Sequence, residues 1–141
     1  MEGVDPQRVA ANLAEIREEV GPDVRVLVAV KYVDVDGLRG LVEGGVSIAG
    51  ENRAQALTEK HAAFPDLEWH FIGQLQSRKV RDIVGRVRLI HSVGSLSACS
   101  QIQARAESPA DCLLEVNVAG EDSKAGVPLA EVGRASCRER V

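Results

Sequence analysis

Lys31 is the residue whose type and position suggest chemistry most directly. It ends the apolar run VRVLVAVK, residues 24–31. A lysine at the end of a buried strand is partly desolvated, and this disfavours its ammonium form. The neutral amine is a nucleophile for carbonyl carbons and forms Schiff bases. The alternative is a strand-end lysine whose long stem carries its charge to solvent.

Further polar residues follow other short apolar segments. His70 and His91 suggest a metal site, but no carboxylate or third nitrogen lies at ligand spacing with them. We therefore predict no metal site and interpret both histidines as structural. Glu51 and Asn52 stand where a helix is expected to begin, so capping competes with ligand contact. Ser92, directly after His91, is a further candidate for ligand contact.

Five apolar segments, each preceded by a helical pattern, recur at intervals of about twenty residues. The first helix is expected to begin at Asp5-Pro6 and to end at Gly21-Pro22. The predicted strands cover residues 24–31, 46–50, 67–73, 87–93 and 111–120. The first of these is continuously apolar, which is typical of a strand that is buried on both faces.

Regular alternation of this kind predicts right-handed crossovers and a parallel sheet in an α/β fold. A doubly wound sheet should carry a glycine-rich phosphate loop after its first strand, and this chain has none there. The pattern therefore favours a partial (β/α)8 TIM barrel of about five β/α units. In such folds ligands bind at the carboxyl ends of the strands, where the residues considered above are expected to lie.

Composition excludes several classes of protein. The 141 residues are 45% hydrophobic, and a net charge of -4 argues against a general binder of nucleic acid or anionic membranes. Cys99, Cys112 and Cys137 are widely spaced, which predicts neither a disulfide framework nor a zinc site and indicates a reducing cytoplasm. No apolar run has the length of a membrane span, and the N-terminus does not resemble a signal peptide.

Five motifs occur together in one order: LVAVK, GENRAQAL followed after two intervening residues by a lysine, EWHFIGQLQSRK, LIHSV and LLEVNVAGEDSKAG. In sequence and separation they closely resemble the pyridoxal 5'-phosphate homeostasis proteins, from about Val24 to Val132. The resemblance implies an alanine racemase N-terminal-like fold, a β/α barrel with pyridoxal phosphate held as a Schiff base on a lysine at the end of an early strand.

On this resemblance the cofactor lysine corresponds to Lys31, and no catalytic residue is expected. The expected cofactor-binding residues are Lys31, Asn52, His70, Ile72, Gly73 and Ser92. The implied function is cofactor binding and homeostasis without turnover. The implied partners are pyridoxal phosphate and the apoenzymes that receive it, with no nucleic acid or membrane, and the full-length form is expected to be a monomer. The alternatives are a racemase or decarboxylase on the same fold, or a fragment without function.

The sequence departs from the family pattern in two places. Gly94 replaces the acid of HSVDS, so we expect a weaker cap on the following helix. The chain also carries only five of eight units, so we expect residues 1–132 to be the N-terminal part of the barrel, open and weak in cofactor binding. Residues 133–141, GRASCRERV, read like a translated sequencing adapter, and we expect them to be a non-native, poorly packed tail. A genuine divergent tail is the alternative.

Overall fold

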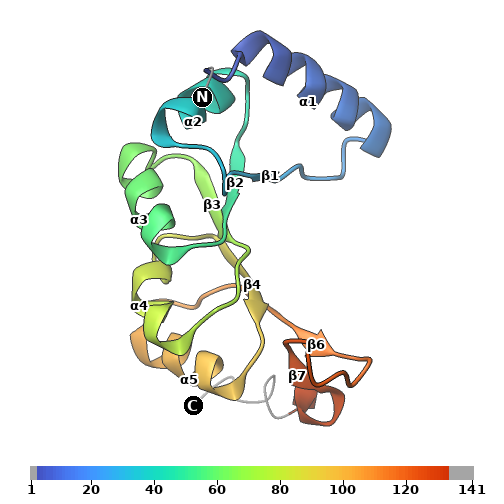
Figure 1. Cartoon of the computed structure of the whole chain (residues 1–141), viewed down its shortest axis with the longest axis vertical. Coiled ribbons are helices and arrows are strands. Elements are labelled where there is room, and N and C mark those ends of the chain that lie inside the picture. Colours follow the sequence, from blue (N-terminus) through green and yellow to red (C-terminus); the bar gives the residue numbers. More distant parts are fainter. Residues whose placement is uncertain (1–2, 134–141) are drawn as a thin grey trace. The chain divides into compact units, whose positions relative to one another are not determined.

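The computed structural model describes residues 3–133 of the chain (Figure 1). The chain divides into two compact units, one up to His70 and one from Phe71 onwards. Each unit is built from β/α repeats. Among residues 3–133, no helix has both the length and the apolar character needed to cross a membrane.

The first unit begins with helix α1, Pro6–Val20, at the position that the sequence predicts. The Asp5 carboxylate accepts a hydrogen bond from the Gln7 amide at 2.9 Å and so satisfies one of the free N–H groups of the first turn. Pro6 follows in the first helical position, and Gly21 ends the helix.

Helix α2, Val35–Glu43, packs against α1 on one side and against helix α3, Ala54–Ala63, on the other. The contact with α1 depends on two residues without side chains. A Cβ added to Gly44 would lie 2.6 Å from Val9 Cβ, and one added to Gly40 would overlap the Val4 carbonyl oxygen. The glycines therefore let the two backbones approach closely.

Three strands complete the first unit in chain order: β1, Val28–Ala29; β2, Ile48–Glu51; and β3, Glu68–Phe71, whose last residue begins the second unit. Strands β1 and β2 are parallel, with Val28 opposite Ala49 and Ala29 opposite Gly50. The expectation of a long first strand buried on both faces is wrong. Only two of its residues are in strand conformation, and Val24 is 51% exposed, because β1 is the edge strand of this unit.

The core of the first unit lies between its helices and strands. It contains Val30, Leu38, Leu41, Val46, Ile48, Leu57 and Trp69. Trp69 is 1% exposed, and its indole N–H donates to the Phe64 carbonyl oxygen at 3.0 Å. The indole therefore contributes a large apolar surface to the core without leaving its donor unpaired.

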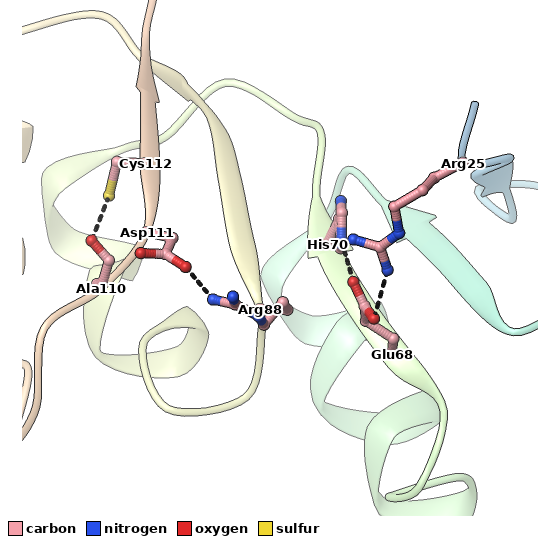
Figure 2. A network of polar contacts seen from close by, with 7 residues as sticks. All are labelled: Arg25, Glu68, His70, Arg88, Ala110, Asp111 and Cys112. Atoms are coloured by element: carbon pink, nitrogen blue, oxygen red, sulfur yellow. Dashed lines mark hydrogen bonds and ion pairs between the residues drawn. The ribbon is translucent and has the colours of Figure 1, made fainter. Parts of the chain in front are cut away.

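The second unit repeats the pattern. It contains the 3-10 turn η1, Ser77–Lys79, and helix α4, Val80–Ile83, followed by β4, Leu89–Val93, helix α5, Leu96–Arg105, and β5, Cys112–Leu114. Strands β4 and β5 are parallel, and α4 and α5 pack together. An exposed ion pair joins Arg88 and Asp111 at the amino ends of these strands (Figure 2).

Helix α5 corrects one expectation from the sequence. Its N-cap is Ser95, whose hydroxyl oxygen accepts a hydrogen bond from the Ala98 amide at 3.1 Å. Because the capping side chain belongs to Ser95, the presence of Gly94 where the family has an acid leaves this side-chain cap in place. A Cβ at Gly94 would approach Gly126 N to 3.3 Å and a Glu115 carboxylate oxygen to 3.4 Å, so this position is tightly packed.

The predicted strand 111–120 is divided. After β5 the chain forms β6, Val116–Asn117, which pairs in parallel with β7, Val127–Pro128, ahead of the turn η2, Leu129–Glu131. Gly126 lies against the backbone of β6 with a φ of +109°, and a Cβ there would be 2.7 Å from Asn117 N. The sequence did not indicate β7, because a two-residue strand has no periodicity to detect.

The suspected tail falls almost entirely outside the described residues. Gly133, its first residue, is exposed at the end of the described range. Residues 134–141 lie beyond that range, so the expectation that they are non-native and poorly packed stays a prediction.

Candidate functional site

Lys31 lies in a tight turn directly after β1. The Val33 amide donates to the Val30 carbonyl oxygen at 3.0 Å, so Lys31 and Tyr32 occupy the two central positions of the turn. The Lys31 side chain is exposed, with Nζ 4.8 Å from the centroid of the Tyr32 ring. This geometry is a cation–π contact at the protein surface.

The exposure of Lys31 corrects the reasoning that singled it out. We expected a partly desolvated amine at the end of a buried strand, but the strand is an edge strand and the lysine extends over an exposed tyrosine. The position at the carboxyl end of the strand is as predicted. The accessibility of Lys31, rather than its burial, is therefore the property that a ligand would encounter.

Behind this turn lies a buried ion pair. Lys60 Nζ is 2.5 Å from Glu51 Oε2 and also donates to the Val30 carbonyl oxygen at 2.7 Å. The Glu51 side chain is fully buried, and that of Lys60 is 6% exposed. The second carboxylate oxygen of Glu51 accepts from the amides of Asn52, at 2.7 Å, and Arg53, at 3.1 Å. Both charges are thus paired and hydrogen-bonded, as buried charges must be.

The sequence interpretation missed Lys60, although a signal was present. Ala54, Leu57 and Lys60 follow one another at intervals of three on helix α3, and all three are buried. A lysine on the apolar stripe of a helix predicts a buried partner of opposite charge. Glu51 was interpreted as a helix-capping residue or a ligand contact, and the structure shows that it contacts the first amides of the α3 region and Lys60 together.

Asn52 follows β2 at the position that corresponds to Lys31 after β1. Ala29 of β1 lies opposite Gly50 of β2, and Lys31 and Asn52 each follow two residues after their member of this pair. The Val30 amide donates to the Gly50 carbonyl oxygen at 2.9 Å. Within residues 3–133, the Asn52 Oδ1 atom is buried and has no hydrogen-bond partner. Such an atom costs free energy unless a ligand or water supplies a donor.

His70 lies within β3 and contacts a charged neighbour on its own strand. Its Nε2 is 2.8 Å from Glu68 Oε1, and Arg25 donates to Glu68 Oε2 at 2.7 Å (Figure 2). The hydrogen bond from His70 and, after it, the one from Arg25 hold the pKa of Glu68 below its ordinary value. His70 is itself buried, which agrees with a structural role.

The lowered pKa of Glu68 predicts a loss of stability in acid. The contribution of this carboxylate is complete above pH 4.5, its ordinary pKa, and is lost as the pH falls through the lower folded-state pKa. We expect the difference in unfolding free energy between the wild type and Glu68→Gln to shrink steadily as the pH falls below that value. Urea denaturation at a series of pH values measures it. Glu59→Gln makes the same replacement at an exposed glutamate and serves as the matched control, and a pH-independent difference for Glu68→Gln would contradict the assignment.

The other predicted site residues belong to the second unit. Ile72 and Gly73 directly follow β3 and are half-buried and buried, and Ser92 is half-buried in β4. Asn117, at the end of β6, has a backbone partner: its side-chain Nδ2 donates to the Glu121 carbonyl oxygen at 2.8 Å. The structure places Lys31 and Asn52 at neighbouring strand ends of the first unit, with His70 inside the third strand.

Residues 3–133 contain no group of three or more His, Cys, Asp or Glu side chains arranged to hold a metal ion. The neighbouring ends of β1 and β2 instead present an exposed amine, that of Lys31, and a buried carboxamide oxygen, that of Asn52. An exposed primary amine can bond covalently to a carbonyl compound, and the carboxamide oxygen can accept a hydrogen bond from it.

Comparison with known proteins identifies relatives of this chain. The pyridoxal phosphate homeostasis protein of Aquifex aeolicus is 43% identical over 108 residues, which is 73% of this chain and 47% of that protein. The homologue with the same name from Corynebacterium glutamicum is 31% identical and is matched over 89% of this chain and 61% of its own length. The chain thus spans about half to three-fifths of these relatives.

Solved structures show the same fold. PipY of Synechococcus elongatus, solved without pyridoxal phosphate, superposes with a TM-score of 0.80 at 30% identity over 89% of this chain and 61% of its own. Alanine racemase from Corynebacterium glutamicum, at 12% identity and a TM-score of 0.68 over 94% of this chain and 39% of its own, shares the fold alone. The predicted α/β class and alanine racemase N-terminal-like fold are confirmed.

The family model for the alanine racemase N-terminal domain matches residues 4–139, which is nearly the whole chain. The strand order of each unit and the superposition on PipY agree with that match. The chain belongs to the alanine racemase N-terminal domain family.

Proposed function

We propose that this chain binds pyridoxal phosphate through Lys31 and serves in cofactor homeostasis without turnover. The observation that carries the proposal is the buried, unpartnered Oδ1 atom of Asn52 at the strand end next to the Lys31 turn. A buried acceptor without a partner is rare in folded proteins and is typical of a site that a ligand completes.

The residues present fit this cofactor. Pyridoxal phosphate supplies an aldehyde that condenses with a primary amine and a conjugated ring that stabilises carbanions. Lys31 provides the amine, which is exposed and therefore accessible, and Asn52 provides a hydrogen-bond acceptor. A PipY structure with pyridoxal phosphate bound matches 78% of this chain at 30% identity and a TM-score of 0.69, and this likeness supports the proposal.

The surroundings of Lys31 support binding rather than catalysis. Turnover on this cofactor needs a positioned proton donor or acceptor besides the lysine. The single tyrosine of the chain, Tyr32, presents its ring face to the Lys31 ammonium, and His70 contacts the Glu68 carboxylate.

The proposal extends to apoenzymes as recipients of the cofactor, to a monomeric full-length form and to the cytoplasm as its location. The cysteine spacing supports the last of these.

The test of this proposal is chemical trapping. Incubation with pyridoxal phosphate followed by borohydride reduction should place the label on the peptide that contains Lys31. We expect Lys31→Ala to reduce the total label at least tenfold, because this variant lacks the accessible amine at the site. Peptide mapping by mass spectrometry measures the position of the label.

One control variant and two contrary outcomes make the test decisive. Lys79→Ala, which removes another exposed lysine, should leave the label on Lys31 unchanged. Label that lies mainly on Lys79 or Lys124 in the wild type would contradict the assignment to Lys31. Steady turnover of any amino acid that is lost in Lys31→Ala would instead favour the racemase or decarboxylase alternative.

A further inference from the structure

We infer that the buried Glu51–Lys60 pair positions Lys31 for the cofactor, by holding the turn that carries it. This inference rests on the proposed role of Lys31 and adds two residues that the proposed site does not include. Glu51 and Lys60 are both on the interior side of the turn and are shielded from solvent. They act through the backbone and do not need to contact a ligand.

The Val30 carbonyl oxygen is the point of contact between the pair and the turn. It accepts one hydrogen bond from the Val33 amide, at 3.0 Å, and another from Lys60 Nζ, at 2.7 Å. The amide of Val30 donates to Gly50 in the neighbouring strand at 2.9 Å. Both peptide groups that flank Val30 are thus fixed, and the direction in which the chain leaves β1 towards Lys31 follows from them.

The same carboxylate also fixes the second residue of the proposed site. Glu51 Oε2 contacts Lys60, whereas Glu51 Oε1 accepts from the Asn52 and Arg53 amides. One ion pair therefore connects the Lys31 turn with the backbone of Asn52, across two neighbouring strands. A pair of apolar side chains could fill this space, but it could not donate to the Val30 carbonyl oxygen or accept from the two amides.

Energetics support a positioning role over a purely stabilising one. Removing two charges from water is costly, and well-packed apolar residues of similar volume often stabilise a protein as much or more. A buried pair that makes three further hydrogen bonds to backbone groups gives directional restraint, which apolar packing does not.

The experiment uses the whole chain and the double variant Glu51→Gln/Lys60→Met, which removes both charges and leaves neither partner buried alone. Hydrogen bonds to charged groups contribute enough that we expect exchange of the Val33 amide to accelerate about tenfold or more. The Leu38 amide, which donates to Asp34 at the start of α2, serves as the internal reference and should change much less. Exchange is measured by NMR.

Cofactor attachment is the second readout. In the double variant we expect the initial rate of borohydride-trapped labelling at Lys31 to fall about tenfold, with labelling of Lys79 unchanged. The single variant Lys60→Arg keeps a cationic donor and should retain labelling within about threefold of the wild type. If the pair only stabilised the fold, the double variant and Lys60→Arg would lose the same amount of Lys31 labelling whenever their folded fractions were equal.

The outcomes separate this inference from the proposed function. A folded double variant with unchanged Val33 exchange and unchanged labelling at Lys31 would overturn the inference. A loss of Lys31 labelling in Lys60→Arg as large as that in the double variant would also overturn it. If the double variant does not fold, the Val33 amide of the wild type decides, because free exchange there would show that the turn is not held. Absence of label from Lys31 in the wild type, with Val33 protected, would contradict the proposed function alone.

Discussion

Lys60→Met is expected to lower the free energy of unfolding by about 3–5 kcal/mol, because it leaves the fully buried Glu51 carboxylate without its counter-charge. Methionine matches the length of the lysine stem, so the change removes charge and hydrogen bonding with little change in packing volume. The lost donation to the Val30 carbonyl oxygen adds to the effect. Urea denaturation followed by circular dichroism measures the free energy.

Two variants serve as controls for this prediction. Lys79→Met makes the same replacement at an exposed lysine and should change the free energy by no more than about 0.5 kcal/mol. The double variant Glu51→Gln/Lys60→Met should recover a large part of the loss, since no charge is then buried alone. A cost near zero for the single variant would mean that Glu51 is neutralised or hydrated, and the buried-pair assignment would fail.

Gly126→Ala is expected to destabilise the second unit by roughly 2–5 kcal/mol, adding about 1–2 for the left-handed backbone to about 1–3 for overpacking. The φ of +109° is one that side chains with a Cβ rarely adopt. The new methyl group would also lie 2.7 Å from Asn117 N and 2.9 Å from the Val116 carbonyl carbon. Both neighbours are backbone atoms, so neither can move aside without breaking the β6–β7 pair.

Gly120→Ala provides the matched control in the same loop. Its φ is +69°, also positive, but a Cβ there would meet no atom within 4 Å. We therefore expect only the backbone term, about 1–2 kcal/mol. The comparison of the two alanine variants by chemical denaturation separates backbone strain from steric overlap. Equal costs in the two variants would contradict the close approach at Gly126.

The helices and the positions of the strands along the chain could be predicted from local sequence rules. Asp5 and Pro6 predict the start of α1, and apolar residues at helical spacing identify α2, α3 and α5. Edge position, by contrast, depends on which strands pair, and that is not local. For this reason the apolar run 24–31 was assigned to a fully buried strand, whereas only Val28 and Ala29 pair.

The site was predictable in part for the same reason. The carboxyl ends of parallel strands gave the positions of Lys31 and Asn52, and the structure confirms that these ends are neighbours. The environment of each side chain could not be read from the sequence, because it depends on partners far along the chain. Lys60 reaches Val30 from thirty residues away, and Glu68 interacts with Arg25 from forty-three.

Trp69 gives this chain a built-in optical probe of one unit. It is the single tryptophan of the sequence, and it lies in the core of the first unit with its indole N–H donating to the Phe64 carbonyl oxygen. Tryptophan emission depends on the polarity around the ring, so an apolar, shielded indole and a solvated one emit at different wavelengths. The wavelength of tryptophan fluorescence therefore reports the opening of the core that supports the Lys31 turn, whereas the second unit contributes no indole to the signal.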